Sequence, residues 1–518
     1  MLIYKRFILL VLMALVLSAC SAPTPETATT RESVISEVPA AIEVPAASVA
    51  ADCPDDAGAY LESGIAKHQQ GKLEEAIADY NQAIALCPSM SAAYNNRGAA
   101  RLQKGDLKGA IADLDQAIAL DPDGTSAYLN RGIVHLQQRE WERAIADFDQ
   151  VIALDPDEAA AYFQRGFARE KQGDQEGAMA DYNMAIELNP DYAKAYHRRG
   201  FIYSERDEMV KAIADYDKSI ELNPDDAAVY DNRAFVRSEL GDPEGALADL
   251  NVAIGLNPND PDAYRNRGAV HSQLGNLKRA IADFDKAIEL NSDDGVAYMG
   301  RGNARKEQGY LEEAIADYNM AIQLAPGYAD AYINRGNARA DKGDWAGANA
   351  DYSSAIELQP EDAGAYASRC IARAQLDDPE GAIADCNTAI ELQPDDAGAY
   401  NNRCIARRLQ GDLDSAIADC KKAIELAPDH VYAYYNRGLA RGVKGDLDGA
   451  ISDFNKVIEI SPDYVNAYYS RAVAQRALGN AEAALDDFRR CLELHPNAAN
   501  RAKVEEWIAE LEAQISEP

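Results

Sequence analysis

A tyrosine recurs every 34 residues along this chain, with no insertion or deletion between one tyrosine and the next. The residues are Tyr60, Tyr94, Tyr128, Tyr162, Tyr196, Tyr230, Tyr264, Tyr298, Tyr332, Tyr366, Tyr400, Tyr434 and Tyr468. A fixed period of this length indicates an array of similar structural units rather than a set of globular domains. We therefore divide the chain into thirteen repeats and number each repeat so that its tyrosine is position 4.

Other positions keep the same register. Position 20 is alanine and position 23 is aspartate in all thirteen repeats, position 8 is glycine or alanine in eleven, and position 32 is proline in twelve. The apolar spacing, interrupted by Gly-Asp and closed by proline, predicts two helices in each repeat. One such pair cannot bury its apolar face alone, so we expect the repeats to stack.

Aspartates stand where both helices of a repeat are expected to begin. Asp106, Asp174, Asp242 and Asp412 follow the glycine punctuation and are predicted to cap second helices. The aspartates just after the prolines are predicted to cap the first helix of the following repeat; they are Asp123, Asp157, Asp191 and Asp225.

An arginine occupies position 7 in twelve repeats, and position 23 is aspartate in every repeat. We interpret the two columns as a repeated ion pair between packed helices; the alternative is a row of anion-binding sites. The formal net charge of −35 disfavours nucleic acid as a partner. Because many acids occupy such structural positions, an acidic binding groove does not follow from the charge.

This pattern resembles the tetratricopeptide repeat over residues 57–498, with its small residues at positions 8, 20 and 27, aromatic at 24 and proline at 32. Tyrosine at position 4 and arginine at position 7 replace the family's usual tryptophan and leucine. The resemblance implies an all-α, right-handed superhelical solenoid of thirteen helix-turn-helix repeats, whose concave groove binds proteins or peptides. Residues 499–518 carry an apolar stripe and are expected to form a C-terminal capping helix.

The first nineteen residues are predicted to be a signal peptide, because Lys5 and Arg6 precede a short apolar run. The following Leu-Ser-Ala-Cys, ending at Cys20, resembles a bacterial lipobox. That resemblance implies cleavage before Cys20 and attachment of fatty acyl chains, such as palmitate, to this residue. The alternative is an ordinary secretory signal.

Residues 20–56 are expected to comprise the acylated cysteine and a flexible tether rich in proline, alanine and threonine. The protein is then expected on the extracytoplasmic side of a bacterial cell envelope, attached to the membrane by its lipid. Ser21 points to the outer membrane if the cell is diderm.

Signals for catalysis or metal binding are absent from the sequence. Six histidines are scattered without metal-ligand spacing, and no phosphate loop or nucleophile motif is present. We expect no metal, no cofactor and no small-molecule substrate, and therefore a protein that is not an enzyme.

Four cysteines occupy two adjacent repeats. Cys370 and Cys404 stand at position 8, and Cys386 and Cys420 stand at position 24. We favour a disulfide within each repeat, which an exported location permits. The alternatives are compensation of volume between the two positions and a recent duplication of one repeat. A crossed Cys386–Cys404 bridge is a further alternative and would leave the other two cysteines unpaired.

The other cysteines after Cys20 are not expected to form disulfides. Cys53 and Cys87 lie one repeat apart, and equivalent Cα atoms in stacked repeats are expected to exceed the roughly 7 Å that a disulfide can span. Cys491 replaces the small residue of position 27 and is expected to be a buried thiol.

Positions 2, 5, 9 and 12 of each first helix fall on one stripe, which lines the groove in the family. Aromatic rings gather there in three successive repeats and are a candidate binding ladder; they are Phe163, Phe167, His197, Phe201 and Phe235. The alternative is that these rings fill the seam between helices.

Lys194 and Arg198 also lie near this stripe and match two positions of the clamp with which some family members hold a peptide's C-terminal carboxylate. The other clamp positions do not match, so carboxylate capture is not predicted. The sequence favours a lipid-anchored extracytoplasmic scaffold that binds an unidentified protein or peptide through its concave face. The alternative is a constitutive structural subunit of an envelope complex for protein insertion, pilus assembly or wall synthesis.

Overall fold

The computed structural model of the chain describes residues 53–495 and 501–516. The predicted signal peptide, Cys20 and the tether up to residue 52 lie outside this range. Within the described residues every regular element is an α-helix, and none is long and apolar enough to cross a bilayer. These residues divide into two compact units, 53–270 and 271–516.

The helices of the first unit are α2 (Asp55–Gln69), α3 (Leu73–Leu86), α4 (Ser91–Lys104), α5 (Leu107–Leu120), α6 (Thr125–Gln137), α7 (Trp141–Leu154), α8 (Ala159–Gln172), α9 (Gln175–Leu188), α10 (Ala193–Glu205), α11 (Met209–Leu222), α12 (Ala227–Glu239), α13 (Pro243–Leu256) and α14 (Pro261–Gln273), within which the division falls. Those of the second unit are α15 (Leu277–Leu290), α16 (Gly295–Glu307), α17 (Leu311–Leu324), α18 (Ala329–Asp341), α19 (Trp345–Leu358), α20 (Ala363–Gln375), α21 (Pro379–Leu392), α22 (Ala397–Gln410), α23 (Leu413–Leu426), α24 (Val431–Lys444), α25 (Leu447–Ile460), α26 (Val465–Ala477), α27 (Ala481–Leu494) and α28 (Arg501–Ser516).

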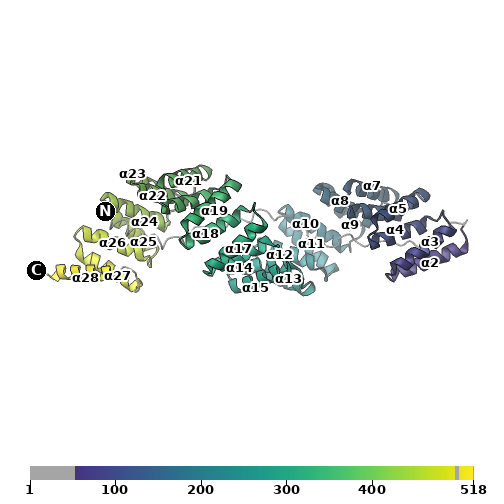
Figure 1. Ribbon diagram of the computed structural model, residues 1–518, viewed down its shortest axis with the longest axis horizontal. Helices are drawn as coiled ribbons and strands as arrows, with labels where there is room; N and C mark the ends of the chain where they lie inside the picture. The colour runs from purple at the N-terminus through teal and green to yellow at the C-terminus, as the bar shows by residue number, and fades with distance from the viewer. Residues whose placement is uncertain (1–52, 496–500, 517–518) are drawn as a thin grey trace. The chain divides into compact units, whose positions relative to one another are not determined.

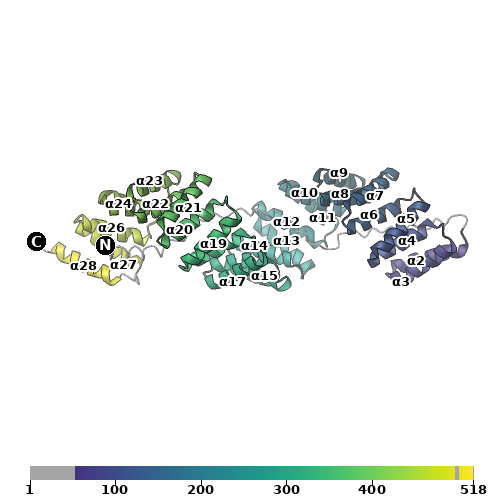
Figure 2. The same ribbon diagram turned by 45° about the horizontal axis from the view of Figure 1, so that its top comes forward.

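Even-numbered helices up to α26 are the first helices of the repeats, and the odd-numbered helices are their partners. Each first helix packs on the second helix of its own repeat, as α4 does on α5, and that second helix packs on the next first helix, as α5 does on α6 (Figures 1 and 2). The expected all-α solenoid of helix pairs is therefore confirmed in each unit. The last helix, α28, packs on α27 and buries Val504 and Leu511.

Second helices begin as the sequence predicts. The carboxylate of Asp106 accepts a hydrogen bond from the backbone N–H of Gly109, and Asp174, Asp242 and Asp412 cap their helices in the same way. The left-handed residue before the cap, such as Gly105 at φ 85°, ends the preceding helix.

The predicted caps of the first helices are wrong by one residue. Asp226 rather than Asp225 caps α12, and Glu158 rather than Asp157 caps α8. The backbone N–H of Asp157 instead donates to the carboxylate of Asp155 inside the connecting turn. The turn after the proline therefore takes one more residue before the helix can begin.

Glycine at position 8 lies against the side chain at position 24 in most repeats, although the thirteenth repeat accommodates Ala472 beside Phe488. A Cβ atom added to Gly336 would lie 2.7 Å from Cε1 of Tyr352, closer than side chains pack. Where position 8 is Ala234, position 24 is the smaller Leu250. The two columns thus fill one space between the helices of a repeat.

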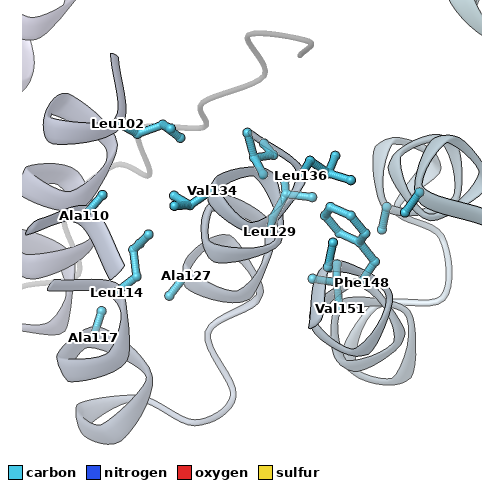
Figure 3. Packing of buried hydrophobic residues seen from close by; sticks show 14 residues of the cluster. Leu102, Ala110, Leu114, Ala117, Ala127, Leu129, Val134, Leu136, Phe148 and Val151 are labelled. Atoms are coloured by element: carbon cyan, nitrogen blue, oxygen red, sulfur yellow. The ribbon is translucent and has the colours of Figure 1, made fainter. Parts of the chain in front are cut away.

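Apolar side chains also meet between repeats. Figure 3 shows such a layer in the first unit, where side chains from α4 and α5 face those of α6, and those of α6 face α7. The labelled residues are Leu102, Ala110, Leu114, Ala117, Ala127, Leu129, Val134, Leu136, Phe148 and Val151. The alanines among them let the helices lie close together, and polar contacts contribute to the same interface.

The predicted ion pair between positions 7 and 23 is confirmed. Arg335 donates two hydrogen bonds to the carboxylate of Asp351, from Nη2 over 2.6 Å and from Nε over 3.1 Å. A second arginine, Arg339, donates to the same carboxylate over 2.7 Å. The equivalent pairs are Arg97–Asp113, Arg131–Asp147, Arg165–Asp181, Arg199–Asp215, Arg233–Asp249, Arg301–Asp317, Arg369–Asp385, Arg403–Asp419, Arg437–Asp453 and Arg471–Asp487.

The same guanidinium also joins neighbouring repeats, which the sequence analysis missed. Nη1 of Arg335 donates to Oδ1 of Asn319, at position 25 of the preceding repeat, over 2.6 Å. The guanidinium lies over the ring of Tyr332, with its carbon 5.5 Å from the ring centroid. One arginine therefore connects both helices of its own repeat with the second helix of the repeat before it.

The cysteines at positions 8 and 24 are bonded within their repeats. Cys370 is joined to Cys386, and Cys404 to Cys420, with Cα–Cα distances of 5.6 Å and 5.5 Å. The ring of position 24 is absent from these repeats, so a cysteine fits at position 8. Whether these thiols are oxidised in the cell stays a prediction.

The expectation for Cys53 and Cys87 is wrong. Their Cα atoms lie 5.5 Å apart and their sulfurs are bonded. Cys53 precedes α2 and has no earlier described helix pair to hold it at the spacing of stacked repeats. Cys491 is, as predicted, a buried free thiol, and burial raises its pKa to about 11.

We call the contacts of the position 7 arginine with its own repeat and the preceding repeat the arginine bridge. They predict how much stability is lost when the arginine is removed. Arg335→Ala should lower the free energy of unfolding by about 3 kcal/mol, because Asp351 is left buried with only Arg339 as its cation. Hydrogen exchange should accelerate in α17, α18 and α19, since stability in a stack is a sum of neighbour terms. Arg279→Ala, at an exposed position, is the matched control and should change stability by less than about 0.5 kcal/mol. Unchanged exchange in these helices would contradict the bridge.

The within-repeat disulfides give a second prediction. Each bridge spans a sequence separation of 16 residues, and a loop of this size contributes about 3 kcal/mol in the chain-entropy model. Protein exported by its native route should yield both linked peptides on non-reducing digestion. Reduction should then lower the unfolding temperature, with faster exchange in residues 363–430 as well as around the Cys53–Cys87 bridge. If the thiols of Cys370, Cys386, Cys404 and Cys420 can all be titrated in that material, volume compensation is left as the explanation.

Candidate functional site

The candidate site is the stripe formed by positions 2, 5, 9 and 12 of the first helices, which we call the first-helix face. Positions 4, 7, 8 and 11 of the same helices turn toward the second helix or the preceding repeat, where their contacts have just been described. By helical spacing, the first-helix face is the stripe left for other contacts. The predicted site residues lie on α8, α10 and α12.

The prediction of an exposed ring is wrong for Phe163. Its side chain is only 3% exposed and belongs to the core, with its ring centroid 4.9 Å from that of Tyr192 and 5.7 Å from that of Tyr182. Tyr192 at position 34 covers this part of the face in its repeat. The alternative interpretation, a ring that fills the seam between helices, holds here.

His197 is buried as well and contacts the neighbouring first helix. One of its ring nitrogens lies 2.9 Å from the side-chain nitrogen of Asn232. Burial lowers the pKa of His197 to about 4, and the Asp226 carboxylate, 3.8 Å away, only partly offsets this effect. His197 is therefore neutral at pH 7 and serves as a contact between helices rather than as an exposed ligand for a partner.

Phe167, Phe201 and Phe235 remain partly exposed at position 9 of three successive repeats. Arg198 lies between two of these rings, with its guanidinium carbon 5.4 Å from the centroids of both Phe167 and Phe201. This arrangement gives one continuous surface on α8 and α10, with two rings separated by a planar cation. Lys194, on the same helix as Arg198, is exposed.

Arg198 is not free to bind a carboxylate of a partner. Its Nε donates to Oε2 of Glu170 over 3.1 Å, and the hydroxyl of Tyr182 donates to the same oxygen over 2.7 Å. Both charged side chains are largely buried. This geometry agrees with the sequence analysis, which did not predict carboxylate capture at Lys194 and Arg198.

A row of hydrogen bonds between adjacent first helices borders the first-helix face. The side chain at position 6 of one repeat bonds to position 5 of the repeat before it, as Asn130 does to Asn95 at 3.0 Å. Equivalent contacts are Asn232–His197, Asn266–Asp231, Asn402–Ala367 and Asn436–Asn401. The signal that could have revealed this row was the repeated asparagine at position 6.

Metal coordination has no support in the part of the chain that the structure describes. No group of three or more histidine, cysteine, aspartate or glutamate side chains there is placed to hold an ion. The side chains of the first-helix face offer rings, amides and single charges, which suit contacts with a polypeptide.

Family models match almost the whole repeat array. Three models described as the tetratricopeptide repeat match residues 132–198, 200–262, 261–294, 333–397, 397–430 and 465–498. A model described as the TPR repeat matches residues 64–105, 98–139, 302–343 and 444–479. A search of curated proteins finds no match.

Several solved structures are similar to this chain. The Cut9–Hcn1 hetero-tetramer of the APC/C shares 14% identity, with 88% of this chain and 96% of the other covered and a TM-score of 0.45. A tetratricopeptide repeat protein from Parabacteroides merdae shares 23% identity over 48% of this chain and 98% of its own, with a TM-score of 0.39. YrrB, described as having an unusual peptide-binding site, shares 28% identity over 36% and 97%, with a TM-score of 0.30.

The matched residues and the helix pairs that they form lead to one conclusion. This chain belongs to the tetratricopeptide repeat family.

Proposed function

We propose that this protein is a lipid-anchored, extracytoplasmic scaffold that binds a protein or peptide along the first-helix face of its repeats. Membership of the tetratricopeptide repeat family supports a role in protein–protein interaction. The finer points of the proposal concern the surface used, the location and the anchor.

The surface is inferred from Phe167, Phe201 and Phe235, the observation that carries the proposal. These rings are partly exposed at the same position of three successive first helices, with Arg198 between two of them. The fixed polar columns, in contrast, are engaged by neighbouring helices. Aromatic and arginine side chains are also those that most often dominate the binding energy of interfaces.

The location and anchor are inferred from the first twenty residues. Two basic residues, a short apolar run and Leu-Ser-Ala-Cys ending at Cys20 support export and acylation. A single acyl chain binds membranes only marginally, and two or more attach a protein stably.

Crosslinking in cells tests the binding surface. A photo-crosslinking amino acid placed at Phe167, Phe201 or Phe235 should give adducts with the same partner, because one ligand runs along successive repeats. Val210 on α11 is 76% exposed and is the matched control, at which these adducts should be absent. Equal yields at Val210 would contradict the proposal. A complex of fixed stoichiometry that survives purification would instead identify a constitutive subunit of an envelope machine.

Metabolic labelling tests the anchor. Labelled palmitate should enter the wild-type protein, and Cys20→Ser should abolish incorporation because the acceptor sulfur is removed. Cys491→Ser is the control, since that thiol is buried and should not affect labelling. Label retained in the Cys20→Ser protein would rule out acylation at this residue.

A further inference from the structure

One arginine of the first-helix face is buried without an anionic partner. Arg408 on α22 is only 7% exposed, and its Nε atom is buried with no hydrogen-bond partner. Among the residues that the structure describes, none forms an ion pair or a hydrogen bond with its guanidinium. An arginine stays charged in proteins, and burial of an uncompensated charge is costly.

The other two arginines of α22 form ion pairs. Arg403 binds Asp419 with two nitrogens, and Arg407 donates to the same carboxylate at 2.7 Å. Arg408 therefore differs from its neighbours in its lack of an acid, although the chain carries a net charge of −35. The protein has ample carboxylates, and none of those described is placed at this guanidinium.

The charged residue at position 12 of another repeat has an oppositely charged partner. Position 12 of one repeat faces position 6 of the next, and in the first unit these positions hold the ion pair of Glu170 and Arg198. By this register the residue opposite Arg408 is Asn436, whose amide donates to Asn401 over 3.0 Å. At these two positions the second unit therefore has the cation of Arg408 but no carboxylate opposite it.

Small residues occupy position 12 on both sides of Arg408. Position 12 is Ala374 in the preceding repeat and Gly442 in the following one. A Cβ atom added to Gly442 would meet a single atom, at 3.9 Å. Tyr435 on α24 lies close enough to interact electrostatically with Arg408, and its hydroxyl lies 3.3 Å from that of Ser470.

We propose that Arg408 binds the carboxylate of an aspartate or glutamate side chain in a peptide that lies along the first helices of the second unit. A planar guanidinium matches a carboxylate with two parallel hydrogen bonds and balances its single charge. A phosphate dianion would call for a second cation, and Arg403 and Arg407 are held by Asp419. Because α24 and α26 continue the face beyond Arg408, a side chain is favoured over a chain terminus. This inference rests on the proposed function and specifies one contact within it.

Selection of binding peptides tests this inference. A library of random dodecapeptides with amidated C-termini is incubated with the full-length protein, and the peptides that bind are identified. Selected peptides should share an acidic residue, and its replacement by asparagine or glutamine should weaken binding about tenfold or more, as for loss of a charged hydrogen bond. In Arg408→Met the same replacement should change affinity less than about twofold, since the two groups form one interaction. Arg408→Lys should retain part of the preference. Arg279→Met removes an exposed charge and should behave as wild type.

Thermal unfolding separates a binding role from a structural one. Arg408→Met should unfold at the same or a higher temperature than wild type, because the variant removes an unpaired buried charge. A lower unfolding temperature, or an acid preference that persists in Arg408→Met, would overturn the inference. Selection of peptides without an acid, or only of those with a free C-terminal carboxylate, would overturn it and leave the scaffold function standing. If no peptide is selected and no partner is crosslinked at the first-helix face, the proposed function fails as well.

Discussion

The fold depends on one guanidinium that recurs at position 7 of the repeats. The interior of a repeat consists largely of alanine, glycine and one ring, so the apolar surface that it buries does not by itself select one register between helices. In Arg335 three nitrogens are directed at fixed oxygens on two different second helices. A buried ion pair of this kind adds little net stability relative to an apolar contact, but its directional donors admit few arrangements.

The two departures from the usual family pattern are parts of this same interaction. Tyrosine at position 4 provides the ring over which the arginine of position 7 lies, as Arg403 lies 5.3 Å from the centroid of the Tyr400 ring. In the first repeat position 7 is Ser63, whose hydroxyl donates to Asp79 over 2.6 Å. Without an arginine above it, Tyr60 is 40% exposed.

The fixed columns could be predicted from sequence, because a residue type repeated in every unit reveals both its position and its partner. The helix pairs, the position 7–23 ion pair and the aspartate caps of the second helices follow from this information. The variable stripe could not be predicted in the same way. Phe163 and Phe167 lie on the same stripe, but position 5, which Phe163 occupies, is buried in most repeats, and the ring of Phe163 packs against those of Tyr182 and Tyr192. Likewise, the absence of an acid beside Arg408 depends on the positions of many side chains.

The arginine bridge also sets how an array of this kind can change in length. An interior repeat offers a donor at position 7 to the repeat before it and, in most cases, an acceptor at position 25 to the repeat after it. The thirteenth repeat carries Arg489 at position 25, which donates to Glu512 of α28 over 2.7 Å. Duplication of an interior 34-residue segment would leave such bridges intact, whereas a repeat joined behind the thirteenth would place its arginine against Arg489. The array can therefore lengthen from within far more readily than at its C-terminal end.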